Sequence, residues 1–229
     1  MIAVNLSQPV TELLYRLQLR EFREHLEKLK RRNGTVWVSD LVYCPLKYVF
    51  RLKYLEVTEG LQFQPSFIFG DLIHKGLEEI LLEHLHEVGF SDVRTEVEVE
   101  KRINVDLGGL PKIVRVSGRL DVLARDRDGW VVIEIKASKA DLHLPHEHHV
   151  LQLRIYMNMV KASRGLLVYI TPDRIAEYWV NEPLTDEELQ ALIAEFLKFK
   201  GPKYDWECRS CFYAHLCPNK VTENRWNRK

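Results

Sequence analysis

The chain has 229 residues, of which 46% are hydrophobic, so it is long enough to bury one good-sized core. Lys and Arg number 33, and so do Asp and Glu, which excludes bulk attraction to a polyanion and restricts any nucleic-acid site to a local patch. No apolar run approaches the roughly 18 to 20 residues that span a bilayer, and the N-terminus lacks the pattern of a signal peptide. We expect one domain over residues 1–229, located in the cytoplasm.

Apolar residues recur every three to four positions in three segments near the N-terminus, which predicts amphipathic helices. These are residues 11–32, 39–54 and 65–88. Ser39 is a suitable N-cap for the second helix, and Pro45 falls in its first turns, where a missing N–H costs least. Gly89 is the expected stop of the third.

The hydrophobic pattern then changes to a period of two, as where Val97 and Val99 alternate with charged residues, which predicts strands. We expect three strands in a meander near 93–104, 112–125 and 130–137, a helix near 147–163, strands near 165–171 and 174–180, and a helix over 185–200 capped by Thr185. The fold class is therefore α/β (α+β mixed), with a mixed central sheet flanked by helices. A helical N-terminal part should pack against a cysteine-rich C-terminal segment.

Two carboxylates and an amine are predicted to meet on the sheet. Glu134 and Lys136 lie two positions apart on an otherwise apolar strand and share one face, and Asp121 on the preceding strand can lie beside Glu134. Close buried carboxylates favour a cation such as Mg²⁺ or Mn²⁺, which takes oxygen ligands. The Lys136 ammonium would orient a water molecule and offset charge in the transition state of phosphodiester hydrolysis. By spacing alone, the Glu-x-Lys pair is as well explained by an ordinary ion pair.

Three further residues strengthen the hydrolytic interpretation. His74 lies on the third helix, and Gln152 and Tyr156 share one face of the helix that follows the Glu-x-Lys strand. Taken singly, His74 and Tyr156 would be read as packed core residues. The order His74, Gly118-x-x-Asp121, Glu134-x-Lys136 and Gln152-x-x-x-Tyr156 resembles the RecB-type branch of the PD-(D/E)xK nucleases.

This resemblance implies a role for each of the matching residues. His74, Asp121, Glu134 and the Ile135 backbone carbonyl would bind the metal, Lys136 would be catalytic, and Gln152 and Tyr156 would position DNA or the active-site helix. All the motifs lie within residues 70–156. A catalytically silent DNA-binding adaptor remains an alternative.

The four cysteines are spaced like metal ligands. Cys208, Cys211 and Cys217 form C-x₂-C-x₅-C, and Cys44 lies far upstream. In a cytosolic chain such thiols stay reduced and tend to hold metals. Four thiolates suit an iron-sulfur cluster or structural zinc, and proline after both outer cysteines favours iron-sulfur.

One cysteine before the nuclease motifs and three after them resemble the iron-staple RecB-like nucleases, including the nuclease domain of AddB. At this length the chain is most similar to the CRISPR-associated RecB-like exonucleases, the Cas-four family. The resemblance implies a [4Fe-4S] or [2Fe-2S] cluster and exonuclease activity, mainly on single-stranded DNA and 5′ to 3′, during CRISPR spacer acquisition. CRISPR integrase subunits would be the partners. A RecB-like repair nuclease outside CRISPR and an iron-sulfur redox sensor are the other readings.

The histidine-rich segment 143–149 lacks the H-E-x-x-H register of zinc proteases, because Val150 stands where the second His belongs. We expect a solvated loop there. A DNA contact from one of its imidazoles is the alternative.

Overall fold

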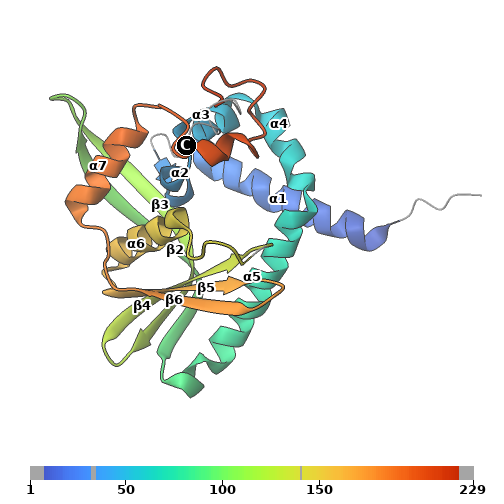
Figure 1. Cartoon of the computed structure of the whole chain (residues 1–229), viewed down its shortest axis with the longest axis vertical. Coiled ribbons are helices and arrows are strands. Elements are labelled where there is room, and N and C mark those ends of the chain that lie inside the picture. The colour runs from blue at the N-terminus through green and yellow to red at the C-terminus, as the bar shows by residue number, and fades with distance from the viewer. Residues whose placement is uncertain (1–7, 32–34, 140, 222–229) are drawn as a thin grey trace, which may run out of the picture.

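The computed structural model describes residues 8–31, 35–139 and 141–221. One mixed sheet has the strand order β1-β3-β4-β5-β6, with β2 paired to β3 (Figure 1). The strands are β1 (Thr35–Trp37), β2 (Ser91–Asp106), β3 (Pro111–Asp126), β4 (Gly129–Ala137), β5 (Arg164–Ile170) and β6 (Ile175–Val180). The helices are α1 (Pro9–Arg31), α2 (Val38–Val42), α3 (Pro45–Lys53), α4 (Leu55–Gly60), α5 (Pro65–His84), α6 (Glu147–Val160) and α7 (Asp186–Phe196).

The pairing of β3 divides the sheet into two parts. Strand β3 pairs with β2 along almost its whole length, but on its other side it pairs first with β1, at 115–117, and then with β4, at 122–126. Residues 118–121 lie between these two ladders. The strands diverge at this point, as Figure 1 shows, which leaves a fork between β1 and β4 on that side of β3.

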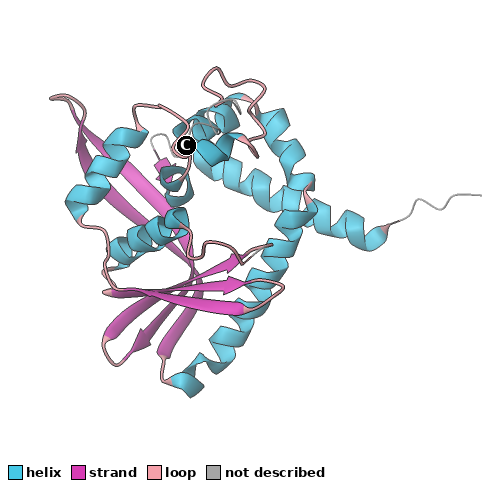
Figure 2. Cartoon of the chain, in the orientation of Figure 1, coloured by secondary structure: helices cyan, strands magenta, loops and turns pink. Residues whose placement is uncertain are grey.

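Helices cover both faces of the sheet (Figure 2). Helix α6 crosses over from β4 to the parallel strand β5 and buries Leu153 and Met157 on one face. Helix α5 packs Leu77 against Ile133 and Ile135 on the other. A fully buried aliphatic side chain such as Leu153 or Ile135 contributes about 1.5–3 kcal/mol to stability. Among the described residues, no helix is both long and apolar enough to cross a membrane.

Most predicted elements are confirmed within a few residues. All five predicted strands are present, α1, α5 and α6 occupy the predicted segments, and Gly89 has the positive φ of 94° expected of a stop. Thr185 caps α7 with its side chain, although that helix ends at Phe196 rather than at residue 200. Residue 32, the predicted end of the first helix, lies outside the described residues.

The predicted helix over 39–54 is wrong in one respect. It is two helices, α2 and α3, broken at Tyr43 and Cys44, and Ser39 lies inside α2 rather than at its N-cap. Cys44 precedes a proline, and a residue in that position is disfavoured from the α conformation, so the second helix restarts with Pro45 at its first turn. This break places Cys44 at a corner.

Candidate metal centre and cysteine cage

The residues Glu134, Lys136 and Gln152 form a closed hydrogen-bonded triangle. The Lys136 ammonium donates to Glu134 Oε1 at 2.7 Å and to Gln152 Oε1 at 3.0 Å, and Gln152 Nε2 donates to the same Glu134 oxygen at 2.8 Å. The alternation of β4 directs Glu134 and Lys136 to one face, and α6 packs on that face and supplies Gln152. The structure thus brings these three predicted residues together.

Asp121 joins this triangle to helix α5. One of its oxygens accepts the Ile135 N–H at 2.7 Å, and the other lies 3.4 Å from His74 Nδ1. Extending the β3–β4 register by one step places Asp121 opposite Glu134. His74, Asp121 and Glu134, all predicted from the sequence, therefore lie close together at the fork of the sheet, next to the backbone of Ile135.

The carboxylate of Glu134 is buried and only partly satisfied by its neighbours. Its side chain is 1% exposed, and Oε2 has no hydrogen-bond partner among the described residues. Burial and the neighbouring Asp121 raise the pKa of Glu134 to about 7, even though Lys136 opposes this shift. Burial would lower the pKa of Lys136, but Glu134 and Asp121 outweigh it and raise that pKa. Glu134 Oε2 and the neighbouring Asp121 carboxylate are oxygen ligands of the kind that a divalent cation takes. The donor set therefore fits Mg²⁺ or Mn²⁺.

Glu78 is a site residue that sequence reasoning missed. Ligand atoms of His74, Glu78 and Asp121 lie within 4.8 Å of one another, the arrangement expected of metal ligands. Glu78 is 8% exposed, and burial raises its pKa, as do Asp121 and Glu96. Glu78 stands four positions after His74, on the same face of α5, and that spacing could have revealed it.

Tyr156 fixes the geometry of the fork. Its hydroxyl donates to the Arg119 carbonyl at 3.0 Å, between the two ladders of β3, and burial raises its pKa. A Cβ added at Gly118 would lie 2.6 Å from the Tyr156 ring, so only glycine admits this close approach. Tyr156 therefore lies close to the site, where its hydrogen bond fixes the β3 backbone that carries Asp121.

A groove opens onto this site from the side of α1 and α5. One part is lined by His74, Glu78 and Asp121 and also by Phe67 of α5. A second part reaches Gln152 and Tyr156. The groove gives an extended ligand access to the acidic residues.

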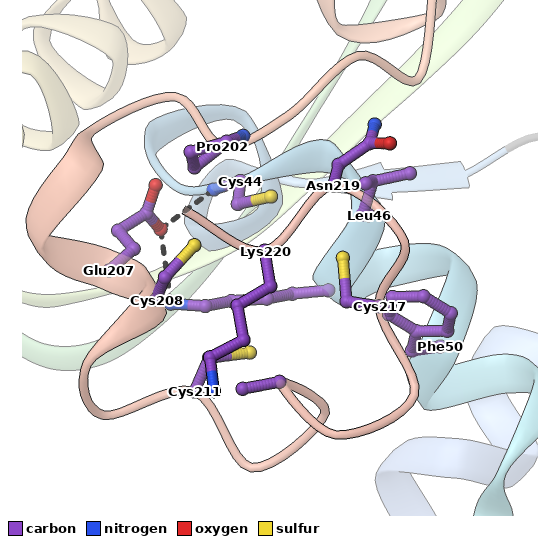
Figure 3. Close-up of a pocket in the computed structure, with 12 residues that line it drawn as sticks. Cys44, Leu46, Phe50, Pro202, Glu207, Cys208, Cys211, Cys217, Asn219 and Lys220 are labelled. Atoms are coloured by element: carbon purple, nitrogen blue, oxygen red, sulfur yellow. Dashed lines mark hydrogen bonds and ion pairs between the residues drawn. The ribbon is translucent and has the colours of Figure 1, made fainter. Parts of the chain in front are cut away.

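The four cysteines converge although they come from both ends of the chain. Cys44, Cys208, Cys211 and Cys217 are free thiols that line one small pocket (Figure 3). A Cβ at Gly201 would lie 2.4 Å from the Cys44 sulfur, so the backbone leaves room there for the thiol. Burial raises the pKa of both Cys44 and Cys211, which is unfavourable for a free thiolate nucleophile. The cage fits a group held by four sulfurs.

A buried carboxylate closes the cage. Glu207 is 1% exposed, and one oxygen accepts the Cys44 N–H at 2.8 Å and the Lys47 ammonium at 3.0 Å, as Figure 3 shows for Cys44. The other oxygen accepts the Tyr204 N–H at 3.0 Å. Because Glu207 directly precedes Cys208, this contact fixes the two parts of the cage relative to each other.

The expectation of a solvated loop over residues 143–149 is wrong for its second half. His146 is the N-cap residue of α6, and His148 and His149 belong to its first turn. Both are partly buried, because the C-terminal segment packs Tyr204 and Trp206 against His148. Long-range packing of this kind leaves no local signal in the sequence.

Comparison with known proteins gives consistent results. The model of the PD-(D/E)XK nuclease superfamily matches residues 81–218. The CRISPR-associated exonuclease Cas4 of Saccharolobus solfataricus is 40% identical over 215 residues, covering 93% of this chain and 100% of that protein. The crystal structure of SSO0001 superposes with a TM-score of 0.84 at 38% identity, covering 94% of this chain and 98% of that one. The chain belongs to the PD-(D/E)XK nuclease superfamily and, within it, to the family of the CRISPR-associated exonuclease Cas4.

Proposed function

We propose that the chain acts as one nuclease domain, over residues 1–229, that hydrolyses DNA phosphodiesters with Mg²⁺ or Mn²⁺. Its substrate would be mainly single-stranded DNA, degraded from 5′ to 3′. The observation that carries the proposal is the buried carboxylate of Glu134. Lys136 donates to its Oε1, its Oε2 has no hydrogen-bond partner among the described residues, and the nearby Asp121 raises its pKa. Burying two neighbouring carboxylates at the fork costs free energy, and a cation bound between them would offset that cost.

In this proposal His74, Asp121, Glu134 and the Ile135 carbonyl hold the cation, and Glu78 joins them. A bound divalent cation supplies Lewis acidity and lowers the pKa of a bound water molecule. Lys136 donates hydrogen bonds toward the reacting phosphate and offsets its growing negative charge. Gln152 orients Lys136, because its Oε1 accepts a hydrogen bond from the Lys136 ammonium at 3.0 Å. Tyr156 positions the strand that carries Asp121.

We further propose that the cysteine cage holds an iron-sulfur cluster, [4Fe-4S] or [2Fe-2S], as a structural staple. Support comes from four sulfurs around one pocket and from the family to which the chain belongs. Four thiolates suit zinc as well, so metal analysis has to separate the two.

The cellular role we propose is trimming of DNA ends during CRISPR spacer acquisition, in the cytoplasm and together with integrase subunits. The name of the relative from Saccharolobus solfataricus, which is CRISPR-associated, supports this role. A repair role outside CRISPR would be favoured instead if the integrase subunits failed to bind the purified chain.

A digestion time course tests the nuclease proposal. Single-stranded DNA labelled at the 5′ or 3′ end is incubated with Mn²⁺ or with chelator, and wild type is compared with Lys136→Ala. We expect cleavage by wild type only with metal, and a rate at least about a hundredfold lower for Lys136→Ala, the usual cost of removing a group that stabilises transition-state charge. The order in which labelled products appear gives the polarity.

Lys139→Ala serves as the matched control, because Lys139 is an exposed lysine three positions further along. Equal inactivity of wild type and Lys136→Ala would favour a silent DNA-binding adaptor. DNA affinity that changes with cluster oxidation, without cleavage, would favour a redox sensor. Equal activity of the two proteins would remove Lys136 from the mechanism.

A further inference from the structure

Aromatic rings from three distant segments form a patch beside the cysteine cage. The aromatic patch consists of Tyr43, His146, His148, Tyr204 and Trp206. His148 lies 5.3 Å from Tyr43 and 5.1 Å from Trp206, between ring centroids. Tyr204 and Trp206 are stacked at 5.7 Å and 14°, as are His146 and His148 at 5.4 Å and 12°.

The patch is joined to the catalytic face of the sheet through Tyr169. Tyr169 pairs in register with Lys136 on the adjacent parallel strand, so both side chains emerge on the same face. The Tyr169 hydroxyl accepts the His146 N–H at 3.0 Å and lies 2.9 Å from His149 Nδ1. Tyr169 therefore connects the strand position next to Lys136 with the histidines of the patch.

The patch ends at the surface on Trp206. This ring is 40% exposed, whereas Tyr169 at the other end is fully buried. Trp206 directly precedes Glu207, which is anchored to Cys44, and lies two positions before Cys208. The cage therefore sets the position of the exposed ring.

The chemistry of the patch suits stacking better than metal binding. Among the described residues, the imidazoles of His146, His148 and His149 do not form a three-ligand group. Burial lowers the pKa of His148 to about 4 and that of His149 to about 2, with Lys136 contributing to both shifts. At neutral pH these rings are uncharged and flat. Aromatic rings of this kind provide platforms for nucleic-acid bases.

We propose that Trp206, supported by Tyr204 and His148, stacks an unpaired base of a DNA strand whose phosphates pass Lys136. This inference rests on the proposed function. Single-stranded DNA is the occupant because its bases offer free faces, whereas duplex bases are already stacked on one another. The site would add affinity that does not depend on phosphate charge, which agrees with a chain whose net charge is zero.

Binding of labelled oligonucleotides tests this site directly. Fluorescence anisotropy is measured with chelator present, for oligo(dT), for the same strand with abasic sites in place of its bases, and for a duplex. For Trp206→Ala we expect a dissociation constant for oligo(dT) about fivefold or more above wild type. Trp206→Phe should recover most of the affinity. The abasic strand should bind Trp206→Ala and wild type equally.

Trp179→Ala is the matched control, because Trp179 on β6 is 47% exposed but lies outside the aromatic patch, with the Arg164 guanidinium over its ring. Visible absorbance and circular dichroism check that each variant retains its cage and fold. If Trp206→Ala binds oligo(dT) as wild type does, the stacking site is overturned, even when wild type cleaves DNA with Mn²⁺. If wild type cleaves nothing but Trp206→Ala still weakens base-dependent binding, the stacking site stands and the nuclease proposal fails.

Discussion

Glu134 shows how a single residue can report a site. Burying a carboxylate without a partner costs several kcal/mol, and Lys136 and Gln152 satisfy only one of its two oxygens. Asp121 adds a second negative charge nearby and contributes to the raised pKa of Glu134. The alternation of side chains along a strand was enough to predict that Glu134 and Lys136 share a face, whereas the contact of Gln152 with both depends on how α6 packs.

Replacing Glu78 tests whether it belongs to the cation site. Glu78→Gln keeps the volume but removes a buried charge that lies within 4.8 Å of ligand atoms on His74 and Asp121. We expect Mn²⁺ affinity to fall about tenfold or more, as it does when residues around a metal are altered. Isothermal titration calorimetry measures the affinity. Glu79→Gln, the exposed neighbour, is the control, and equal affinity in both variants would exclude Glu78 from the site.

Gly118 tests the importance of close packing at the fork. In Gly118→Ala the new methyl would lie 2.6 Å from the Tyr156 ring, so β3 or α6 must shift. We expect a loss of about 1–3 kcal/mol in the free energy of unfolding, the usual cost of overpacking, measured by urea denaturation. Gly76→Ala in α5 is the control, since nothing lies within 4 Å of its added methyl. An unchanged urea midpoint for Gly118→Ala would contradict this packing.

At the scale of elements, the sequence predicted what local periodicity encodes and missed what distant packing decides. The strands and α5–α7 were predicted because their patterns extend over many residues. The three-residue strand β1 is too short for a period, and its pairing with β3 joins residues 35–37 to 115–117. The apolar residues of α5 predicted a helix correctly but did not show which of them are buried. Ile73 and Leu77 pack on the sheet, whereas Phe69 and Leu72 are exposed.

The first turn of α6 should make the fold sensitive to acid. Burial, His146, Lys136 and Lys47 together lower the pKa of His148 to about 4, against an opposing effect of Glu207. An unfolded histidine has a pKa of about 6.5, so the unfolded chain binds the proton more readily. The stabilising contribution of the neutral ring is complete above pH 6.5 and is lost as pH falls toward 4.

We therefore expect the melting temperature of wild type to fall between pH 6.5 and pH 4.5, and to fall less in His148→Gln. Differential scanning fluorimetry across this range gives the comparison. His86→Gln, at an exposed position, should follow wild type. Parallel curves for wild type and His148→Gln would show that this imidazole does not contribute to acid sensitivity.

At the scale of the whole molecule, the cage brings together segments that are far apart in sequence, and a metal group bound there would link them covalently. Cys44 and Glu207, which are in contact, are separated by 163 positions. Closing a loop of this length removes chain entropy from the unfolded state, equivalent to about 5 kcal/mol of stability. The spacing of the cysteines predicted that the four thiols would meet, as they do, whereas Glu207 was not predicted because a lone Glu has no motif.

Cys44→Ala tests both the ligand set and this stabilisation. Removing one of four ligands should abolish the visible absorption of a bound iron-sulfur cluster, lower the iron and acid-labile sulfide content, and decrease the melting temperature. Ser210→Ala, an exposed substitution between Cys208 and Cys211, should leave all three unchanged. A visible spectrum that persists in Cys44→Ala would exclude Cys44 as a ligand. If the wild type is colourless and holds one zinc ion per chain, zinc takes the structural role proposed for the cluster. Four thiolates constrain the chain equally with either metal.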